Sequence, residues 1–268
     1  MLITAALLAL CASAEGPAKK DLLDRAQAAL TDFRPEEAVK LLERAKEKGP
    51  HGYAAHARLY ELLGIAYAYL ERTDDALGAF DTLLAIDPGR AISYTLSPKV
   101  TFLFEQARGK AAARPPPSVQ VSWSYDLMVG EEIPIQIEVI ADPYGFLKRA
   151  HLHHRLRGSP TFESIEIVLP PPGQRTTARL PPVAADRPEA VELHLEALDA
   201  QGNEVLKWAS AERPRDVSLG FDPPTPWYGR WWVWGIAGGV VAAGAAAAAL
   251  ALTQEPSPSV RGTFEVGP

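Results

Sequence analysis

The chain has 268 residues, of which 47% are hydrophobic and 22% are charged, and this composition is ordinary for a folded protein. Its net charge of -6 argues against a basic nucleic-acid-binding surface. The single cysteine, Cys11, lies in an apolar stretch at the N-terminus. If that stretch is removed, no disulfide, cysteine-based metal site or cysteine nucleophile can form.

The N-terminal apolar stretch predicts an export signal over residues 1–14. It spans residues 2–12 and leads into Ala12-Ser13-Ala14, whose small side chains fit cleavage after Ala14. The stretch is too short to act as a stable membrane anchor. A buried N-terminal helix and a lipoprotein site at Cys11 are the alternatives, although Leu10 stands where a lipoprotein site needs a small residue.

Residues 15–113 show helical periodicity, and residues 57–90 carry a recognisable spacing of large and small side chains. Small residues stand where two antiparallel helices would touch, and aromatic residues stand where they would fill the space between them. The residues concerned are Tyr60, Leu63, Gly64, Tyr67, Ala76, Phe80 and Pro88. Over this stretch the chain resembles the tetratricopeptide repeat (TPR) family, which implies a helical hairpin.

A degenerate unit precedes the good one, over residues 19–52. Residues 35–38 align with residues 73–76 at an offset of 38, and Ala26 and Ala29 replace the glycine and tyrosine of the pattern. Two units leave an end of the stack exposed. We expect a capping helix over residues 97–112, with Ser97 as N-cap and Pro98 in the first helical position. The alternative is that another chain covers this end.

The resemblance also implies a concave face that receives a peptide or a partner helix. In the good unit the positions facing this groove would be Arg58, Glu61, Ile65 and Tyr69. The alternative is that these side chains are solvated or pack on a neighbouring helix.

Residues 117–218 change to the alternating pattern of β-strands after a proline-rich linker. Strands are expected around residues 119–125, 133–139, 150–156, 165–169, 191–197 and 205–209, with a long crossover through residues 170–182. Such a series of short strands predicts an antiparallel sandwich of the immunoglobulin or fibronectin III type.

One histidine cluster is a candidate metal site. His151 and His153 share a strand face and are candidate ligands, and His194 is a third if its strand is a neighbour. A row of arginines on the same face disfavours a cation, so a solvated face is the favoured interpretation. These arginines, Arg149, Arg155 and Arg157, have a second possible role in pairing with Glu192 and Glu196 across strands. We predict no resident metal or cofactor and, without phosphate-loop, zinc-protease or nucleophile motifs, no enzyme activity.

The segment 230–252 is predicted to be a transmembrane helix, after a linker over residues 219–229 and before a tail over residues 253–268. Residues 231–252 contain no charge and begin with a cluster of tryptophans. Gly235 and Gly239 offer a small-residue face through which two such helices could form a homodimer.

The sequence therefore predicts a multidomain α plus β protein with TPR-like α-helical hairpins, an antiparallel β-sandwich and a single C-terminal transmembrane helix. With a working signal peptide, the body lies in the periplasm and the helix in the bacterial inner membrane; a tail-anchored protein with a cytoplasmic body is the alternative. The expected function is that of an envelope scaffold that binds unknown protein partners. The alternatives are an envelope module that binds glycan or metal on the sandwich, and a non-catalytic subunit that positions an enzyme.

Overall fold

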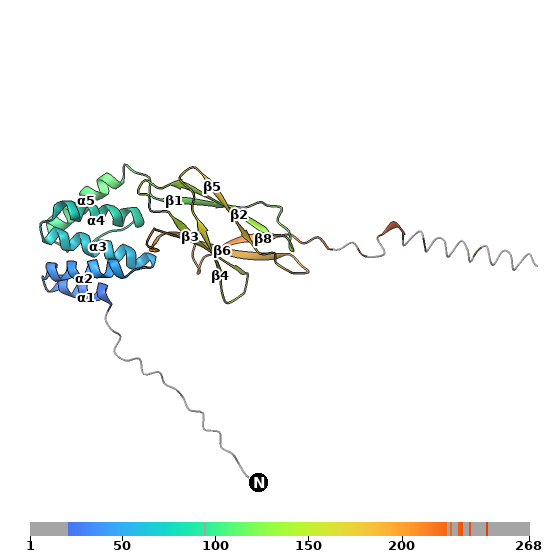
Figure 1. Ribbon diagram of the computed structural model, residues 1–268, viewed down its shortest axis with the longest axis horizontal. Helices are drawn as coiled ribbons and strands as arrows, with labels where there is room; N and C mark the ends of the chain where they lie inside the picture. Colours follow the sequence, from blue (N-terminus) through green and yellow to red (C-terminus); the bar gives the residue numbers. More distant parts are fainter. Residues whose placement is uncertain are drawn as a thin grey trace, which may run out of the picture. The chain divides into compact units, whose positions relative to one another are not determined.

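The computed structural model describes residues 21–93 and 95–223, together with residues 226, 230–232, 236 and 245. The described residues up to Phe221 form one compact unit, and the chain divides after this residue. Within the described part, five α-helices come first and eight β-strands follow (Figure 1). The strands form two antiparallel sheets, so the predicted mixed α plus β class is confirmed.

The helices begin where the local sequence favours a helix start. They are α1 (Leu22–Thr31), α2 (Pro35–Lys48), α3 (Tyr53–Tyr69), α4 (Thr73–Ile86) and α5 (Pro98–Ala111). The carboxylate of Asp21 accepts a hydrogen bond from the first amide of α1, and prolines open α2 and α5, where no amide donor is needed. Ser97 occupies the N-cap of α5, but its side chain makes no capping hydrogen bond to the described residues.

The α1–α2 and α3–α4 turns are built alike. Phe33 and Glu71 occupy equivalent positions and both have left-handed backbone conformations, with φ of 56° and 61°. In each turn the following amide, of Arg34 or Arg72, donates to the carbonyl five residues earlier, at 2.8 Å and 3.0 Å. This is the Schellman pattern of a helix C-terminus. The two helical hairpins therefore repeat the same local geometry at the offset seen in the sequence.

The second hairpin depends on a close contact between a glycine and an aromatic ring. A Cβ atom added to Gly64 of α3 would lie 2.4 Å from the ring of Phe80 of α4, so only glycine fits without a shift of that ring. Phe80 is fully buried and meets the ring of Phe104 of α5 edge-on, with centroids 5.3 Å apart. Helix α5 thus extends the apolar core beyond α4 and covers that side of the hairpin.

The strands divide between a three-stranded and a five-stranded sheet. They are β1 (Ser118–Ser122), β2 (Ile133–Ala141), β3 (Arg149–Leu156), β4 (Glu163–Val168), β5 (Arg175–Leu180), β6 (Glu189–Leu198), β7 (Glu204–Trp208) and β8 (Arg215–Leu219). The smaller sheet has the order β1-β2-β5. The larger sheet has the spatial order β4-β3-β6. On the other side of β6, β8 pairs with its first half (residues 189–193) and β7 with its second half (residues 195–198). The inward side chains of both sheets, such as Ile135 and Leu152, belong to one apolar core.

Three expectations about the strands were wrong. Strand β5 lies within the expected crossover, and β8 follows the strand that was expected to be last. Both are edge strands with few buried side chains, which leaves only a weak alternation in the sequence. Strand β1 ends at Ser122 rather than continuing to Tyr125, whose side chain is fully exposed.

The predicted signal peptide and most of the predicted membrane span, including Gly235 and Gly239, lie outside the described residues. Among the helices that the structure describes, none combines the length and apolar character needed to cross a bilayer.

Candidate functional site

A groove opens on the helical half and collects all four residues that the TPR resemblance implied. Arg58, Glu61, Ile65 and Tyr69 project from α3 into a space of about 440 Å³. The other lining residues come from α1 and its following turn, from α3 and from the α4–α5 connection: Gln27, Leu30, Thr31, Phe33, Leu62, Arg90, Ser93 and Leu96. The groove therefore joins three segments that are distant in the sequence.

The charges in this groove are paired, and its remaining lining combines apolar side chains with the polar groups of Gln27, Thr31 and Ser93. Arg58 contacts Asp24 of α1 at 2.9 Å, and Arg90 donates to the Glu61 carboxylate, with its Nε atom 2.9 Å away. Leucine and isoleucine side chains lie between these pairs, and Phe33 at the lining is 84% exposed. The Arg58–Asp24 pair is partly exposed on both sides and contributes little to stability, so a bound partner can exchange it at low cost, whereas Glu61 is only 19% exposed in its pair with Arg90.

The other residues of the repeat pattern pack the helical core. Leu63, Ala76 and Phe80 are buried, and the Tyr67 hydroxyl donates to Glu43 of α2 at 2.6 Å. Burial, followed by the hydrogen bond to Glu43, raises the pKa of Tyr67 to about 12. Tyr60 is half-buried against the core. These residues position the groove and do not line it.

A second site is a histidine cluster on the outer face of the larger sheet. Strands β3 and β6 are neighbours, and their register places His153 directly opposite His194. The two imidazole rings stack with centroids 4.4 Å apart and planes 8° from parallel. One ligand atom from each ring and one from Glu196 all lie within 4.8 Å of one another. His151 lies outside this group, with its ring 6.0 Å from that of His153.

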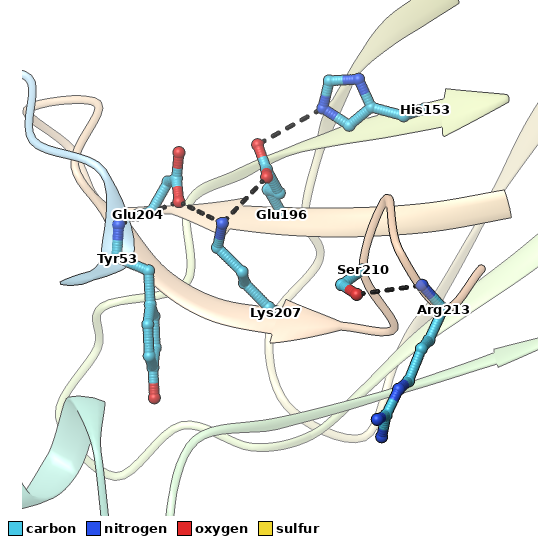
Figure 2. Close-up of polar contacts among 7 residues, drawn as sticks. All are labelled: Tyr53, His153, Glu196, Glu204, Lys207, Ser210 and Arg213. Carbon is cyan, nitrogen blue, oxygen red and sulfur yellow. Dashed lines mark hydrogen bonds and ion pairs between the residues drawn. The ribbon is translucent and has the colours of Figure 1, made fainter. Parts of the chain in front are cut away.

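Glu196 connects the histidine cluster to the helical half through a chain of charged groups (Figure 2). Its carboxylate lies 3.4 Å from His153 Nε2 and 3.2 Å from Lys207 Nζ, and Lys207 also contacts Glu204 at 3.1 Å. Burial alone would raise the pKa of Glu196, but the hydrogen bond and charge of Lys207, together with the two imidazoles, lower it below its usual value. The carboxylate is therefore ionised at neutral pH.

The arginine row on this face is neutralised by cross-strand acids. The pairs are Arg149 with Glu166 at 2.9 Å, Arg155 with Glu192 at 2.6 Å, and Arg157 with Asp216. Of the two cross-strand pairings considered from the sequence, the one to Glu192 forms, whereas Glu196 faces His153 and Lys207. The arginines therefore offer less opposition to a cation than the sequence suggested.

A polar junction links α3 to the β6–β7 hairpin. Gly52, the N-cap of α3, has no side chain, and the Glu204 carboxylate accepts the hydrogen bond from the Tyr53 amide at 2.9 Å instead. The Asn203 side chain accepts from the His51 amide at 2.8 Å, and the His51 carbonyl accepts from the Glu204 amide at 2.9 Å. The start of the groove helix is thus fixed by residues of the sheet.

Glu204→Ala is expected to lower the free energy of unfolding by about 1–3 kcal/mol, because a helix cap and a hydrogen bond to a charged group are lost together. Urea denaturation followed by circular dichroism measures this change. The matched control is Glu132→Ala, which removes a glutamate from a mostly exposed ion pair with Arg179. Equal midpoints for the two variants would contradict a capping role for Glu204.

A smaller cavity of about 290 Å³ lies where the ends of the two sheets meet. His154 faces this cavity from β3 and is 8% exposed, and neither of its ring nitrogens has a hydrogen-bond partner among the described residues. Burial lowers the pKa of this histidine. The site offers an imidazole that is neutral at pH 7 beside apolar side chains and the hydroxyls of Ser159 and Thr161.

The comparisons with known proteins assign no family to this fold. No family model matches the chain, and no curated protein matches it. Solved structures show only a weak likeness, and two of them illustrate it. A myokine structure is 14% identical, with a TM-score of 0.27, and the match covers 40% of this chain and 96% of that one. The PKD domain of an M14-like peptidase from a Thermoplasmatales archaeon is 12% identical, with a TM-score of 0.22. That match covers 41% of this chain and 99% of the PKD domain. At these scores neither likeness carries an argument about fold or function.

Sequence reasoning named His194 but had no means of placing it beside His153. Residues two apart on one strand are separated by about 7 Å, whereas directly opposed residues on neighbouring strands are about 5 Å apart. The closest histidine pair therefore depends on the register of β3 and β6, and no local motif specifies that register.

Proposed function

We propose that this protein is a membrane-anchored scaffold that binds a segment of a partner protein in the groove between α1, α3 and the α4–α5 connection. The observation that carries the proposal is the convergence of Arg58, Glu61, Ile65 and Tyr69 on that groove. These positions follow from the TPR resemblance, in which the concave face receives peptides or helices.

The lining supports a partner segment that is partly apolar and carries at least one charge. Leu30, Ile65 and Leu96 provide apolar contacts, and Phe33 offers an exposed ring beside them. The side chains of Arg58 and Arg90 remain more than one third exposed in their ion pairs. A carboxylate of the partner can therefore compete for Arg58, whose present partner Asp24 is 51% exposed and stays in contact with water when displaced.

The predicted signal peptide and transmembrane helix supply the anchoring half of the proposal. They imply that the helices and sheets stand outside the cytoplasmic membrane and meet partners there. The tail-anchored topology, with the body in the cytoplasm, would leave the groove and its chemistry unchanged. Only the compartment of the partner would differ.

Site-specific photocrosslinking in intact cells tests the groove. A photoreactive residue at position 69 is expected to give a discrete adduct with a partner protein. The same residue at position 102 is expected to give none, because Phe102 is a 69% exposed side chain of α5 that does not line the groove. Phe33→Ser should weaken the adduct at position 69, because it removes an exposed ring while leaving the core intact.

Identical adducts at positions 69 and 102, or an adduct at position 69 that is unaffected by Phe33→Ser, would contradict docking in this groove. Circular dichroism of the purified Phe33→Ser chain provides the folding control. An unchanged spectrum and melting curve link any loss of the adduct to the surface rather than to unfolding.

A further inference from the structure

We propose that His153, His194 and Glu196 bind a divalent metal ion of the zinc class on the outer face of the larger sheet. The site is independent of the groove, since its three residues come from β3 and β6. The proposal starts from the grouping of two imidazole nitrogens and a carboxylate oxygen within 4.8 Å of one another.

Each imidazole of this cluster has a buried nitrogen without a hydrogen-bond partner among the described residues. These nitrogens are His153 Nε2 and His194 Nδ1. The 3.4 Å approach of the Glu196 carboxylate to His153 Nε2 does not meet the geometry of a hydrogen bond. Buried polar atoms are nearly always paired in native proteins, so two unpaired nitrogens on stacked rings need a cause. A coordinated cation satisfies both at once.

The three side chains are of the types that bind Zn²⁺. Imidazole nitrogens and carboxylate oxygens are its usual ligands alongside thiolates. His194 is only 6% exposed, so its ring has little contact with water that would compete with a metal.

Small side-chain rotations complete the coordination geometry. Tetrahedral ligands at about 2.0–2.1 Å from Zn²⁺ stand roughly 3.3 Å apart, so the three ligand atoms have to close in. The imidazole rings are within 8° of parallel, and their in-plane lone pairs converge only when one ring turns about its Cβ–Cγ bond. The backbone register already places the two residues opposite each other, so no strand has to move.

Lys207 competes with the metal for the Glu196 carboxylate. Its ammonium group contacts the Glu196 carboxylate at 3.2 Å and the Glu204 carboxylate at 3.1 Å. When a cation takes the Glu196 oxygen, Lys207 retains Glu204 as its partner. Removal of the ammonium group should therefore strengthen metal binding, which is a directional consequence of this geometry.

The surroundings favour a borderline metal over a hard one. Two of the three ligands are imidazoles, which suit Zn²⁺, Cu²⁺ and Ni²⁺, whereas Ca²⁺ and Mg²⁺ prefer sites built from oxygen. Phe162 packs edge-on against His194, with centroids 4.6 Å apart, and Arg155 lies 4.1 Å above the Phe162 ring. This aromatic contact shields one side of the cluster from water. Three protein ligands leave the fourth position for water or an external ligand.

Isothermal titration calorimetry with zinc chloride tests the proposal on the untagged, full-length chain in detergent after chelator treatment. We expect saturable binding of one ion per chain. His153→Ala and His194→Ala should each weaken the affinity about tenfold or more, because each removes a ligand. His151→Ala is the matched control on the same strand face and should retain the parent affinity. An excess of Mg²⁺ should not displace the zinc.

Lys207→Gln should tighten zinc binding, whereas Arg149→Gln, which removes a similar charge from the same face but does not contact Glu196, should have a smaller effect. Cobalt(II) provides a second readout, since a four-coordinate site gives intense visible absorption bands that a loosely held surface ion does not. Absence of saturable binding in the parent, or equal zinc affinity in the parent and a folded His153→Ala/His194→Ala variant, would overturn the proposal. Circular dichroism shows that the variants compared are folded.

Discussion

Replacement of Phe80 by alanine is expected to lower the free energy of unfolding by about 3–5 kcal/mol, the range for removal of a buried aromatic side chain. Phe80 is fully buried, fills the space left by Gly64 and meets Phe104 edge-on. Its loss therefore opens a cavity at the point where α3, α4 and α5 come together. Urea denaturation, followed by the circular dichroism of the helices, measures this change in the free energy of unfolding.

Phe102→Ala is the matched control, since it removes the same side chain from an exposed position of α5. A surface substitution of this kind is expected to change stability by less than about 0.5 kcal/mol. If both variants lost the same stability, the Gly64–Phe80 contact would not be the centre of the helical core. A measured cost for Phe80→Ala below about 1 kcal/mol would lead to the same conclusion.

The metal-free protein is expected to lose stability steeply as the pH falls below 6.5. Burial is the main cause of a lowered pKa at His56, His154 and His194, whose ordinary value is 6.5. Below that pH the unfolded chain binds protons that the folded chain does not. Each histidine can then remove about 1.4 kcal/mol per pH unit until its own folded pKa is reached, or up to about 4 kcal/mol per unit for all three.

Urea denaturation at about pH 7.5, 6.5 and 5.5 in the presence of a chelator measures this dependence. His56→Gln and His194→Gln should each reduce the slope between the two lower pH values, since each removes one of the three groups with a lowered pKa. Stability that is flat from pH 6.5 to 5.5 would show that the three imidazoles accept protons in the folded state. The interval from pH 6.5 to 5.5 lies above the pH range in which carboxylates of lowered pKa, such as Glu196, change the free energy of unfolding.

The helical half was the more predictable part of the structure. A helix is defined by contacts three and four residues apart, so capping residues, prolines and apolar periodicity report on it directly. The repeat pattern predicted that Gly64 lies where the two helices touch and that Phe80 fills the space between them, and the structure brings these two residues into contact. The equivalent turns at Phe33 and Glu71, in contrast, use non-glycine residues at positive φ, a choice that turn chemistry does not predict.

The sheets were predictable as strands but not as a topology. Central strands such as β2 and β3 alternate clearly, whereas the edge strands β5 and β8 bury few side chains and escaped prediction. Strand pairing joins residues far apart in the chain, and a shift of one residue in register would move every side chain to the opposite face. The sequence therefore left the cross-strand neighbours of His153 undetermined, and the structure identifies them by placing β3 beside β6.

By itself, the sequence determined the order of helices before strands and the antiparallel character of the sheets, because these depend on local spacing. The groove positions on α3 were implied only by the TPR resemblance. Only the tertiary structure decided that His194 stacks on His153, that Glu196 lies beside them, and that Glu204 of β7 caps α3. The contacts of His153 join residues more than 40 positions apart, and their distances follow from the register of β3 and β6. The contact of Glu204 with Tyr53 joins residues 151 positions apart and follows from the packing of the β6–β7 hairpin against the helices. The physical reason is that secondary structure responds to neighbours in the chain, whereas a binding site is assembled from side chains that only the folded backbone brings together.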